Sequence, residues 1–237
     1  MKGMIFAAGL GTRFKPWTDT KPKALAVVNG KSLLQRAVEY LRQYGIQEIV
    51  VNVHHFAEQV EQAVKDADGW GARIHISDER SELLDTGGGM LKAKEWLQTG
   101  TFITLNVDIL SDANLKDFLV EHQRDNAVIT LATTERDSSR KLLFNKYDRL
   151  CGWRNNGTGE EKLVLQASEY FEKAYSGIAI FEPQVFNYTK LKGKFSLIDL
   201  YLELAHDNKI SSYEHSGSKL LDVGKPGSVE QAERMFA

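Results

Sequence analysis

Short apolar runs alternate with amphipathic segments through the first half of the chain, and this alternation limits the folds that are open to it. Met1–Ala8 and Ile46–Val53 have the length and composition typical of buried strands. Between them, Leu34, Val38 and Leu41 recur at helical spacing. Strands separated by single helices predict an α/β fold: a mostly parallel central sheet, right-handed crossovers and helices on both faces. The other strands expected here are Ala72–Ser77, Phe102–Val107 and Val128–Thr133, and the helices are Ser32–Gly45, Phe56–Ala67, Gly89–Leu97 and Leu115–Arg124.

The pattern changes after about Glu135, where the runs become shorter and are separated by turns. Leu142–Asn145, Arg149–Trp153 and Leu163–Gln166 predict a small β-hairpin layer inserted before the sheet resumes at Tyr175–Phe181. No segment has the composition of a linker between domains, so we expect one domain over residues 1–237, with halves 1–134 and 135–237. The remaining expected elements are helices Phe195–Asp207 and Pro226–Phe236 and strands Ile210–Glu214 and Lys219–Val223.

Composition and charge exclude several classes of protein. The net charge is −2 and the pI is about 6.3, whereas a dedicated nucleic-acid-binding protein is usually basic. The apolar runs are too short to cross a bilayer, and the first residues lack a signal-peptide pattern, so we expect no membrane partner. A single cysteine, Cys151, allows no internal disulfide, which fits a cytoplasmic protein; we interpret it as a core side chain.

A glycine loop carrying cations follows the first expected strand. Gly9 and Gly11 allow phosphate oxygens to approach the backbone, Arg13 offers a two-pronged donor, and Lys23 adds a compact charge. The loop is not a Walker loop, because the run G-x-x-x-x-G-K-[ST] is absent. It is not a dinucleotide fingerprint either, because Phe14 stands where the third glycine of the fingerprint belongs. The alternative is a surface turn with solvated cations, but so many features in one short stretch favour a phosphate-binding loop.

Two aspartates stand near the ends of strands that are far apart in the sequence. Asp108 follows the run Phe102–Val107, and Asp222 follows Leu220 and Leu221. Ligands of open parallel sheets gather at the carboxyl ends of the strands. Two carboxylates there could share one Mg²⁺, together with substrate phosphates. Taken singly, either aspartate is better explained as a helix cap or a solvated strand end.

Five motifs together resemble the signature of the sugar-phosphate nucleotidyltransferases, the nucleoside-diphosphate-sugar pyrophosphorylases. They occur in the family's order and span nearly the whole chain: Ala7–Phe14, Pro22–Leu25, Asp85–Gly89, Leu105–Asp108 and Leu221–Pro226. The resemblance implies a Rossmann-like fold of the nucleotide-diphospho-sugar transferase type. It also implies an Mg²⁺-dependent reaction of a nucleoside triphosphate with a sugar 1-phosphate, giving a nucleoside-diphosphate sugar and pyrophosphate. The form of the base loop is most similar to bacterial N-acetylmuramate 1-phosphate uridylyltransferases, followed by mannose 1-phosphate guanylyltransferases.

The resemblance also implies roles for individual residues. Arg13, Lys23 and Asp108 would be catalytic, and Asp108 and Asp222 would hold the metal. The family's Glu-Glu-Lys-Pro run is absent before Tyr175, and Arg154 is the candidate replacement for its lysine. The implied nucleotide-binding residues are Ala8, Gly9, Gly11, Thr12, Arg13, Glu79, Leu84, Thr86, Gly87, Gly88 and Asn106, and the implied sugar-binding residues are Arg154, Ser176 and Gly177.

Several alternatives stay open. Within the family, these are guanylyl transfer to mannose or heptose 1-phosphate and cytidylyl transfer to an alcohol phosphate. Outside it, the chain could be a nucleotide-sugar sensor without turnover, although the presence of Arg13, Lys23, Asp108 and Asp222 together argues against that. A sugar 1-phosphate oxygen is already anionic at neutral pH, so direct in-line attack needs no general base and no covalent enzyme intermediate. The protein could be a monomer or a homo-oligomer.

Overall fold

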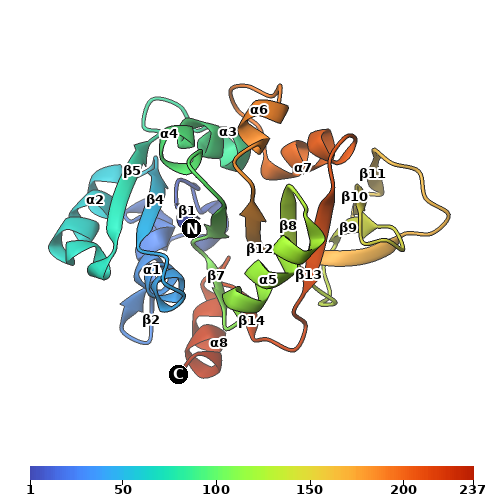
Figure 1. The fold of residues 1–237 in the computed structure, drawn as a ribbon. Helices are drawn as coiled ribbons and strands as arrows, with labels where there is room; N and C mark the ends of the chain where they lie inside the picture. Colours follow the sequence, from blue (N-terminus) through green and yellow to red (C-terminus); the bar gives the residue numbers. More distant parts are fainter.

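Strands and helices succeed one another much as expected, with several short elements added, in a computed structural model that describes residues 1–237 (Figure 1). The strands are β1 (Lys2–Phe6), β2 (Val27–Val28), β3 (Lys31–Ser32), β4 (Glu48–Val53), β5 (Arg73–Asp78), β6 (Phe102–Asn106), β7 (Ile109–Ser111), β8 (Ile129–Thr134), β9 (Arg140–Phe144), β10 (Leu150–Asn155), β11 (Glu160–Leu163), β12 (Phe171–Phe181), β13 (Ile210–Glu214) and β14 (Leu220–Asp222). The α-helices are α1 (Leu33–Gln43), α2 (Ala57–Asp66), α3 (Asp85–Lys92), α4 (Lys94–Leu97), α5 (Leu115–Asp125), α6 (Val185–Tyr188), α7 (Leu197–Ala205) and α8 (Gly227–Met235). Short 3₁₀ turns cover Thr12–Phe14, Trp17–Asp19, Lys23–Leu25 and Asp68–Gly71.

The main sheet is mixed, and most of its strands are parallel. The order β5-β4-β1-β6-β12-β8-β13 forms its central part, and only β12 runs antiparallel to its neighbours there. The α/β class with a mostly parallel sheet is therefore confirmed. The direction of β12 could not be predicted from the sequence pattern. This strand inserts between β6 and β8 and pairs with both.

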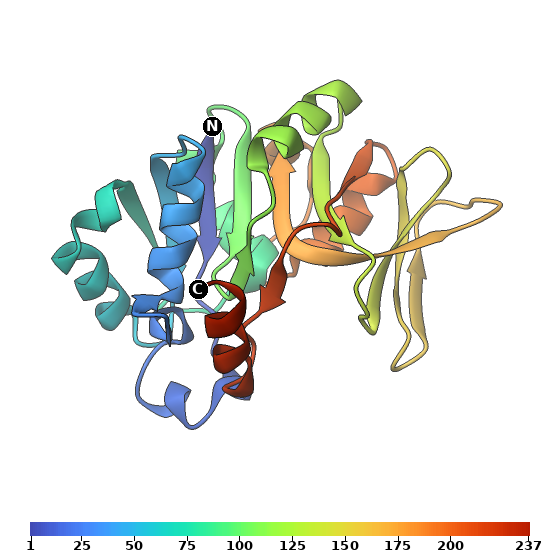
Figure 2. The ribbon, with the colours of Figure 1, turned by 90° about the horizontal axis from the view of Figure 1, so that it is seen from below.

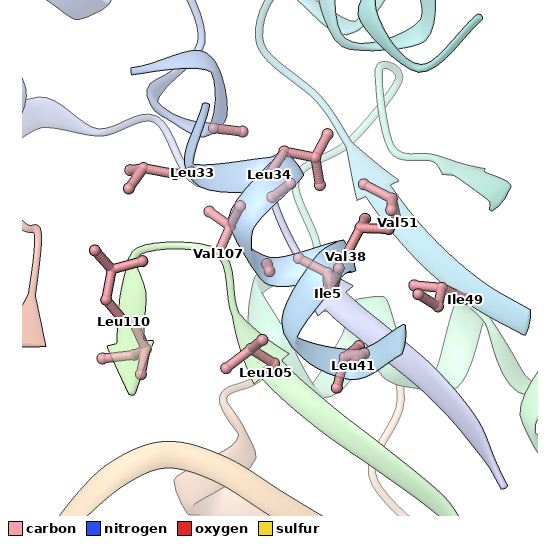
Figure 3. Packing of buried hydrophobic residues seen from close by; sticks show 14 of the residues in the cluster. Ile5, Leu33, Leu34, Val38, Leu41, Ile49, Val51, Leu105, Val107 and Leu110 are labelled. Atoms are coloured by element: carbon pink, nitrogen blue, oxygen red, sulfur yellow. The ribbon is translucent and has the colours of Figure 1, made fainter. Parts of the chain in front are cut away.

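Helices cover both faces of this sheet. Side chains alternate along each strand, so neighbouring residues of one strand pack against helices on opposite faces. Ile5 of β1 belongs to a core cluster with α1, α2, α5 and α8, whereas its neighbours Met4 and Phe6 belong to a second cluster with α3, α4, α6 and α7. Figure 3 shows the first cluster, in which Leu34, Val38 and Leu41 of α1 lie over β1, β4 and β6. No helix is both long and apolar enough to span a membrane.

The inserted hairpin layer is present and projects from the β13 side of the sheet (Figure 2). It consists of β9, β10 and β11, and it joins the sheet through Phe171–Lys173 at the beginning of β12. The third strand lies at Glu160–Leu163, so the expected range of Leu163–Gln166 was wrong and began three residues too late. Cys151 is buried in this layer and unpaired, as expected of a core side chain.

A small two-stranded sheet brings the end of the chain back to its middle. In this sheet β14 pairs with β7, so that Asp222 stands opposite Ile109. The Val223 amide also donates to the carbonyl oxygen of Asp108 at 2.8 Å. This pairing places the two candidate metal ligands side by side, although 114 residues (222 minus 108) separate them.

Candidate active site

The glycine loop and the carboxyl ends of β1 and β6 enclose a cavity of about 300 Å³. The loop is held by Gly11, whose φ of 60° suits glycine and whose added Cβ would lie 2.8 Å from Thr18 Cγ2. Thr18 Oγ1 in turn donates to the Gly11 carbonyl at 3.0 Å. Buried Phe14 anchors the far side of the loop in the core. The cavity is lined by Phe6, Ala7, Gly9, Gly11, Thr12, Arg13, Lys23, Thr86, Asn106, Val107, Asp108 and Gly224.

Two cations and two acids meet at one side of this cavity. Lys23 Nζ forms an ion pair with Asp108 Oδ2, and their side chains are only 11% and 22% exposed. Gly224 lies between Arg13 and Asp222, since a Cβ there would be 3.1 Å from Arg13 Nη2 and 2.7 Å from Asp222 Oδ1. Only a glycine allows the guanidinium and the carboxylate to approach the backbone this closely.

The environment of Asp222 is electrostatically unfavourable for its charge. Although the side chain borders an open cavity, burial by the surrounding protein raises its pKa above the ordinary aspartate value, and the neighbouring Asp108 charge raises it further. Lys23, Arg13 and Arg136 offset part of this shift. A carboxylate whose charge is disfavoured in this way, next to a second carboxylate, fits a divalent cation, which would relieve the repulsion.

The protein offers these two carboxylates and no larger group of ligands. No set of three or more His, Cys, Asp or Glu side chains is arranged to hold a metal ion. Such a set would suit zinc, whereas Mg²⁺ commonly binds to one or two carboxylates and completes its shell with water and substrate phosphates. Asp108 and Asp222 are therefore a donor set of the kind that Mg²⁺ uses.

A second cavity, of about 560 Å³, lies between this acidic pair and the hairpin layer. Arg13 lines both cavities, and Asp222 lines the second. Two molecules, one bound in each cavity, would therefore both contact Arg13. The lining residues are Arg13, Arg136, Ser138, Ser139, Arg140, Lys141, Leu142, Trp153, Tyr175, Ile198 and Asp222.

The structure brings most of the expected nucleotide and catalytic residues together. Gly9, Gly11, Thr12, Arg13, Lys23, Thr86, Asn106 and Asp108 all line the first cavity. Ala8, Glu79, Leu84, Gly87 and Gly88 do not.

Glu79 has a structural position that its sequence context did not indicate. Its carboxylate is 0% exposed and accepts hydrogen bonds from Asn52 Nδ2 at 2.7 Å and from the Leu84 amide at 3.0 Å. Asn52 Oδ1 accepts in turn from the Ala7 amide at 2.7 Å. Glu79 and Asn52 thus connect the ends of β1, β4 and β5 to the start of α3, behind the cavity wall.

The three glycines of the expected base loop lie inside α3, so the prediction of a helix beginning at Gly89 was wrong. The amides of Gly87 and Gly88 donate to the Phe195 carbonyl at 2.9 and 3.2 Å and are not free for a base. A Cβ at Gly88 would lie 2.2 Å from the Gly193 carbonyl oxygen. Gly87 and Gly88 allow α3 to pack directly on the segment before α7, and Thr86 is the residue of this motif that reaches the cavity.

The three expected sugar-binding residues do not line the second cavity. Arg154 is held on the hairpin layer by Glu161 and Glu172, with N–O distances of 2.6 Å to each. Ser176 is fully buried and hydrogen-bonded to His215 Nε2 at 2.8 Å, and Gly177, with φ of 77°, forms part of an irregularity in β12. The cavity cations Arg136, Arg140 and Lys141 were missed, because their stretch also fits a solvated hairpin face.

Comparison with known proteins agrees with this arrangement. A model of the family described as "Nucleotidyl transferase" matches residues 2–149. The N-acetylmuramate alpha-1-phosphate uridylyltransferase of Caulobacter vibrioides is 32% identical over 99% of this chain and 96% of its own length. The mannose-1-phosphate guanyltransferase beta-A of Xenopus laevis is 26% identical over 95% of this chain and 62% of its own length.

The fold agrees as well. The crystal structure of HddC from Yersinia pseudotuberculosis complexed with GMP-PN superposes with a TM-score of 0.80 over 100% of this chain and 99% of that one, at 21% sequence identity. That similarity concerns the fold, while the family assignment rests on the sequence matches, which confirm the expected resemblance. The chain belongs to the nucleotidyl transferase family.

Proposed function

We propose that this protein transfers a nucleotidyl group from a nucleoside triphosphate to a sugar 1-phosphate, with Mg²⁺ held by Asp108 and Asp222. For the specific reaction we propose UTP and an N-acetylmuramate-type hexose 1-phosphate, giving the UDP-sugar and pyrophosphate. Similarity to a named N-acetylmuramate 1-phosphate uridylyltransferase along almost the entire chain supports this choice.

One observation carries the proposal: two cavities adjoin, and Arg13 lines both. Transfer joins two polyanions, so the protein must hold both and reduce their repulsion where they meet. The first cavity has the glycine loop and Lys23 for a triphosphate. The second has several cations and an apolar wall that includes Trp153, which suits a sugar phosphate.

The residues of this chain divide the proposed work by position. The loop amides and Arg13 hold the β- and γ-phosphates, which leave as pyrophosphate. Lys23, anchored by Asp108, lies where it can donate to the α-phosphate. Arg136 lies close enough to Asp222 to influence its pKa and would orient the incoming phosphate. The sugar phosphate oxygen attacks the α-phosphorus as an anion, so no side chain has to remove a proton. When bound, Mg²⁺ supplies charge neutralisation between the two substrates.

Pyrophosphate release from a panel of nucleoside triphosphates and sugar 1-phosphates tests the proposal. We expect release with UTP and N-acetylmuramate 1-phosphate in the presence of Mg²⁺. Release that requires GTP with mannose or heptose 1-phosphate would instead identify a guanylyltransferase. Binding of triphosphate and sugar phosphate without any release would identify a sensor and contradict the proposed reaction.

A further inference from the structure

The second cavity has more positive charge than a single sugar phosphate requires. Arg13, Arg136, Arg140 and Lys141 line it, against one acid, Asp222. Arg13 lines both cavities, and Arg136 lines the second cavity with its guanidinium bonded to the Tyr175 carbonyl of β12, so we assign these two cations to the phosphate. They suffice for the phosphate of the proposed substrate, and this leaves the cations of β9 to be explained.

Two of these four cations, Arg13 and Arg140, have a charged group without a partner in the protein, whereas Arg136 and Lys141 are bonded to carbonyl oxygens. Arg136 Nη2 donates to the Tyr175 carbonyl and Lys141 Nζ to the Arg136 carbonyl, both at 2.9 Å. Arg13 makes no hydrogen bond or ion pair, but it lines both cavities and is assigned to the phosphates where the two substrates meet. The Arg140 backbone amide bonds to Ser138 Oγ, but its guanidinium makes no hydrogen bond or ion pair. A guanidinium on a cavity wall, without a carboxylate beside it, is available to bind a ligand.

The strand register directs Arg140 toward the cavity. On β9 and β10, Leu142 stands opposite Trp153, and cross-strand partners share a face of the sheet. Arg140 lies two residues before Leu142 and therefore shares that face, and Arg140, Leu142 and Trp153 all line the cavity. Lys141 lies on the other face and also lines the cavity, but its Nζ is bonded to the Arg136 carbonyl. Arg154 lies on the opposite face of the layer, where Glu161 and Glu172 neutralise it.

We infer that Arg140 binds a carboxylate substituent of the sugar, so that the second cavity selects an acidic sugar 1-phosphate over its neutral counterpart. This inference rests on the proposed function and adds the residue that determines sugar specificity. The planar guanidinium fork matches a carboxylate in a bidentate arrangement. The half-buried Trp153 side chain beside it would pack against the carbon skeleton that carries the acid.

Two substrates that differ only in a lactyl ether, which carries a carboxylate, test the inference. N-acetylmuramate 1-phosphate is N-acetylglucosamine 1-phosphate with an added lactyl ether, which carries the carboxylate. For Arg140→Gln, we expect the ratio of kcat/KM for the acidic to the neutral substrate to fall about tenfold to hundredfold, the range of a lost charge-assisted hydrogen bond. The loss should lie mainly in KM. Calorimetric binding of N-acetylmuramate 1-phosphate alone should weaken by a similar factor, and Arg140→Lys should restore part of the ratio.

Matched variants make the result specific. Lys146→Gln removes one positive charge at the exposed turn of the same layer, outside the cavity, and should leave the ratio unchanged. Glucose 1,6-bisphosphate compared with glucose 1-phosphate tests a second phosphate in place of the carboxylate, and we expect no dependence on Arg140 there. If the bisphosphate depends on Arg140 as strongly, the assignment to a carboxylate is wrong.

Other outcomes would overturn the inference in distinguishable ways. An unchanged ratio in Arg140→Gln, or a fall in Arg154→Gln instead, would remove Arg140 from the sugar site while leaving nucleotidyl transfer intact. A wild-type protein that uses N-acetylglucosamine 1-phosphate but not N-acetylmuramate 1-phosphate would do the same. If no triphosphate and sugar phosphate pair releases pyrophosphate, the proposed function fails, and the inference fails with it.

Discussion

Substitution of Glu79 by glutamine separates a structural role from a base-reading role. The carboxylate accepts from two donors, Asn52 Nδ2 and the Leu84 amide, one on each oxygen. Glutamine keeps one acceptor oxygen and places an NH₂ group against the other donor. The variant therefore preserves shape and volume while it removes one hydrogen bond and weakens the second.

The magnitude follows from these two bonds. A buried donor left without an acceptor costs about 1–3 kcal/mol, and exchanging a charged acceptor for a neutral one costs about 1 kcal/mol more. We therefore expect Glu79→Gln to lower the free energy of unfolding by roughly 2–4 kcal/mol. For a domain of this size, that corresponds to a fall of roughly 5–15 °C in Tm. Urea denaturation and calorimetry measure it, with Glu82→Gln as a control at an exposed position nearby.

If the role of Glu79 is structural, we also expect a specific kinetic result. Because Glu79 is fully buried behind the cavity, the ratio of kcat/KM between UTP and the other triphosphates should stay within about twofold in Glu79→Gln, since no contact with the base is lost. A variant with normal stability but altered choice of base would refute the reasoning. It would return Glu79 to the nucleotide-binding role that the family resemblance implies.

Three further predictions concern the metal site, the glycine helix and a buried histidine. Asp222→Asn should abolish Mn²⁺ binding in calorimetry and lower kcat at least roughly hundredfold with an unchanged circular dichroism spectrum; near-normal values would remove Asp222 from the metal site. Gly88→Ala places a Cβ 2.2 Å from the Gly193 carbonyl oxygen and should cost about 1–3 kcal/mol in urea unfolding, whereas Gly100→Ala, in open space, should cost little. Burial lowers the pKa of His122 in the folded protein. As the pH falls through about 6.5, the His122 imidazole is therefore protonated in the unfolded chain before it is protonated in the folded one, and the free energy of unfolding decreases. The drop in unfolding free energy between pH 7.5 and 5.5 should be smaller in His122→Gln, and an equal drop would contradict this.

The alternation of strands and helices was legible in the sequence because it is a local property. Side-chain periodicity in α1 and the apolar runs of β1 and β4 depend on which residues neighbour each other along the chain. The glycine loop was equally legible, since Gly11 and Arg13 act within a few residues of each other. The direction of β12 was not, because strand order and orientation depend on contacts between distant segments.

The parts of the site that could not be predicted from the sequence also depend on contacts between distant segments. The partner of Glu79 is Asn52, which is distant in the chain and has no motif of its own. Gly87 and Gly88 are explained by packing against Phe195 and Gly193, residues more than a hundred positions away. Arg140 could not be recognised as a cavity residue, because charged residues look alike in sequence, whether they face water or a cavity.

The pairing of β14 with β7 has a consequence for biosynthesis. A nascent chain that ends before Leu220 already contains the glycine loop, Lys23 and Asp108, yet it lacks the opposing carboxylate. Under the proposed function such an unfinished polypeptide cannot turn a triphosphate over, because it also lacks Gly224 of the first cavity. Product formation therefore reports that the late segment has docked, which gives a simple readout for refolding and fragment-complementation experiments.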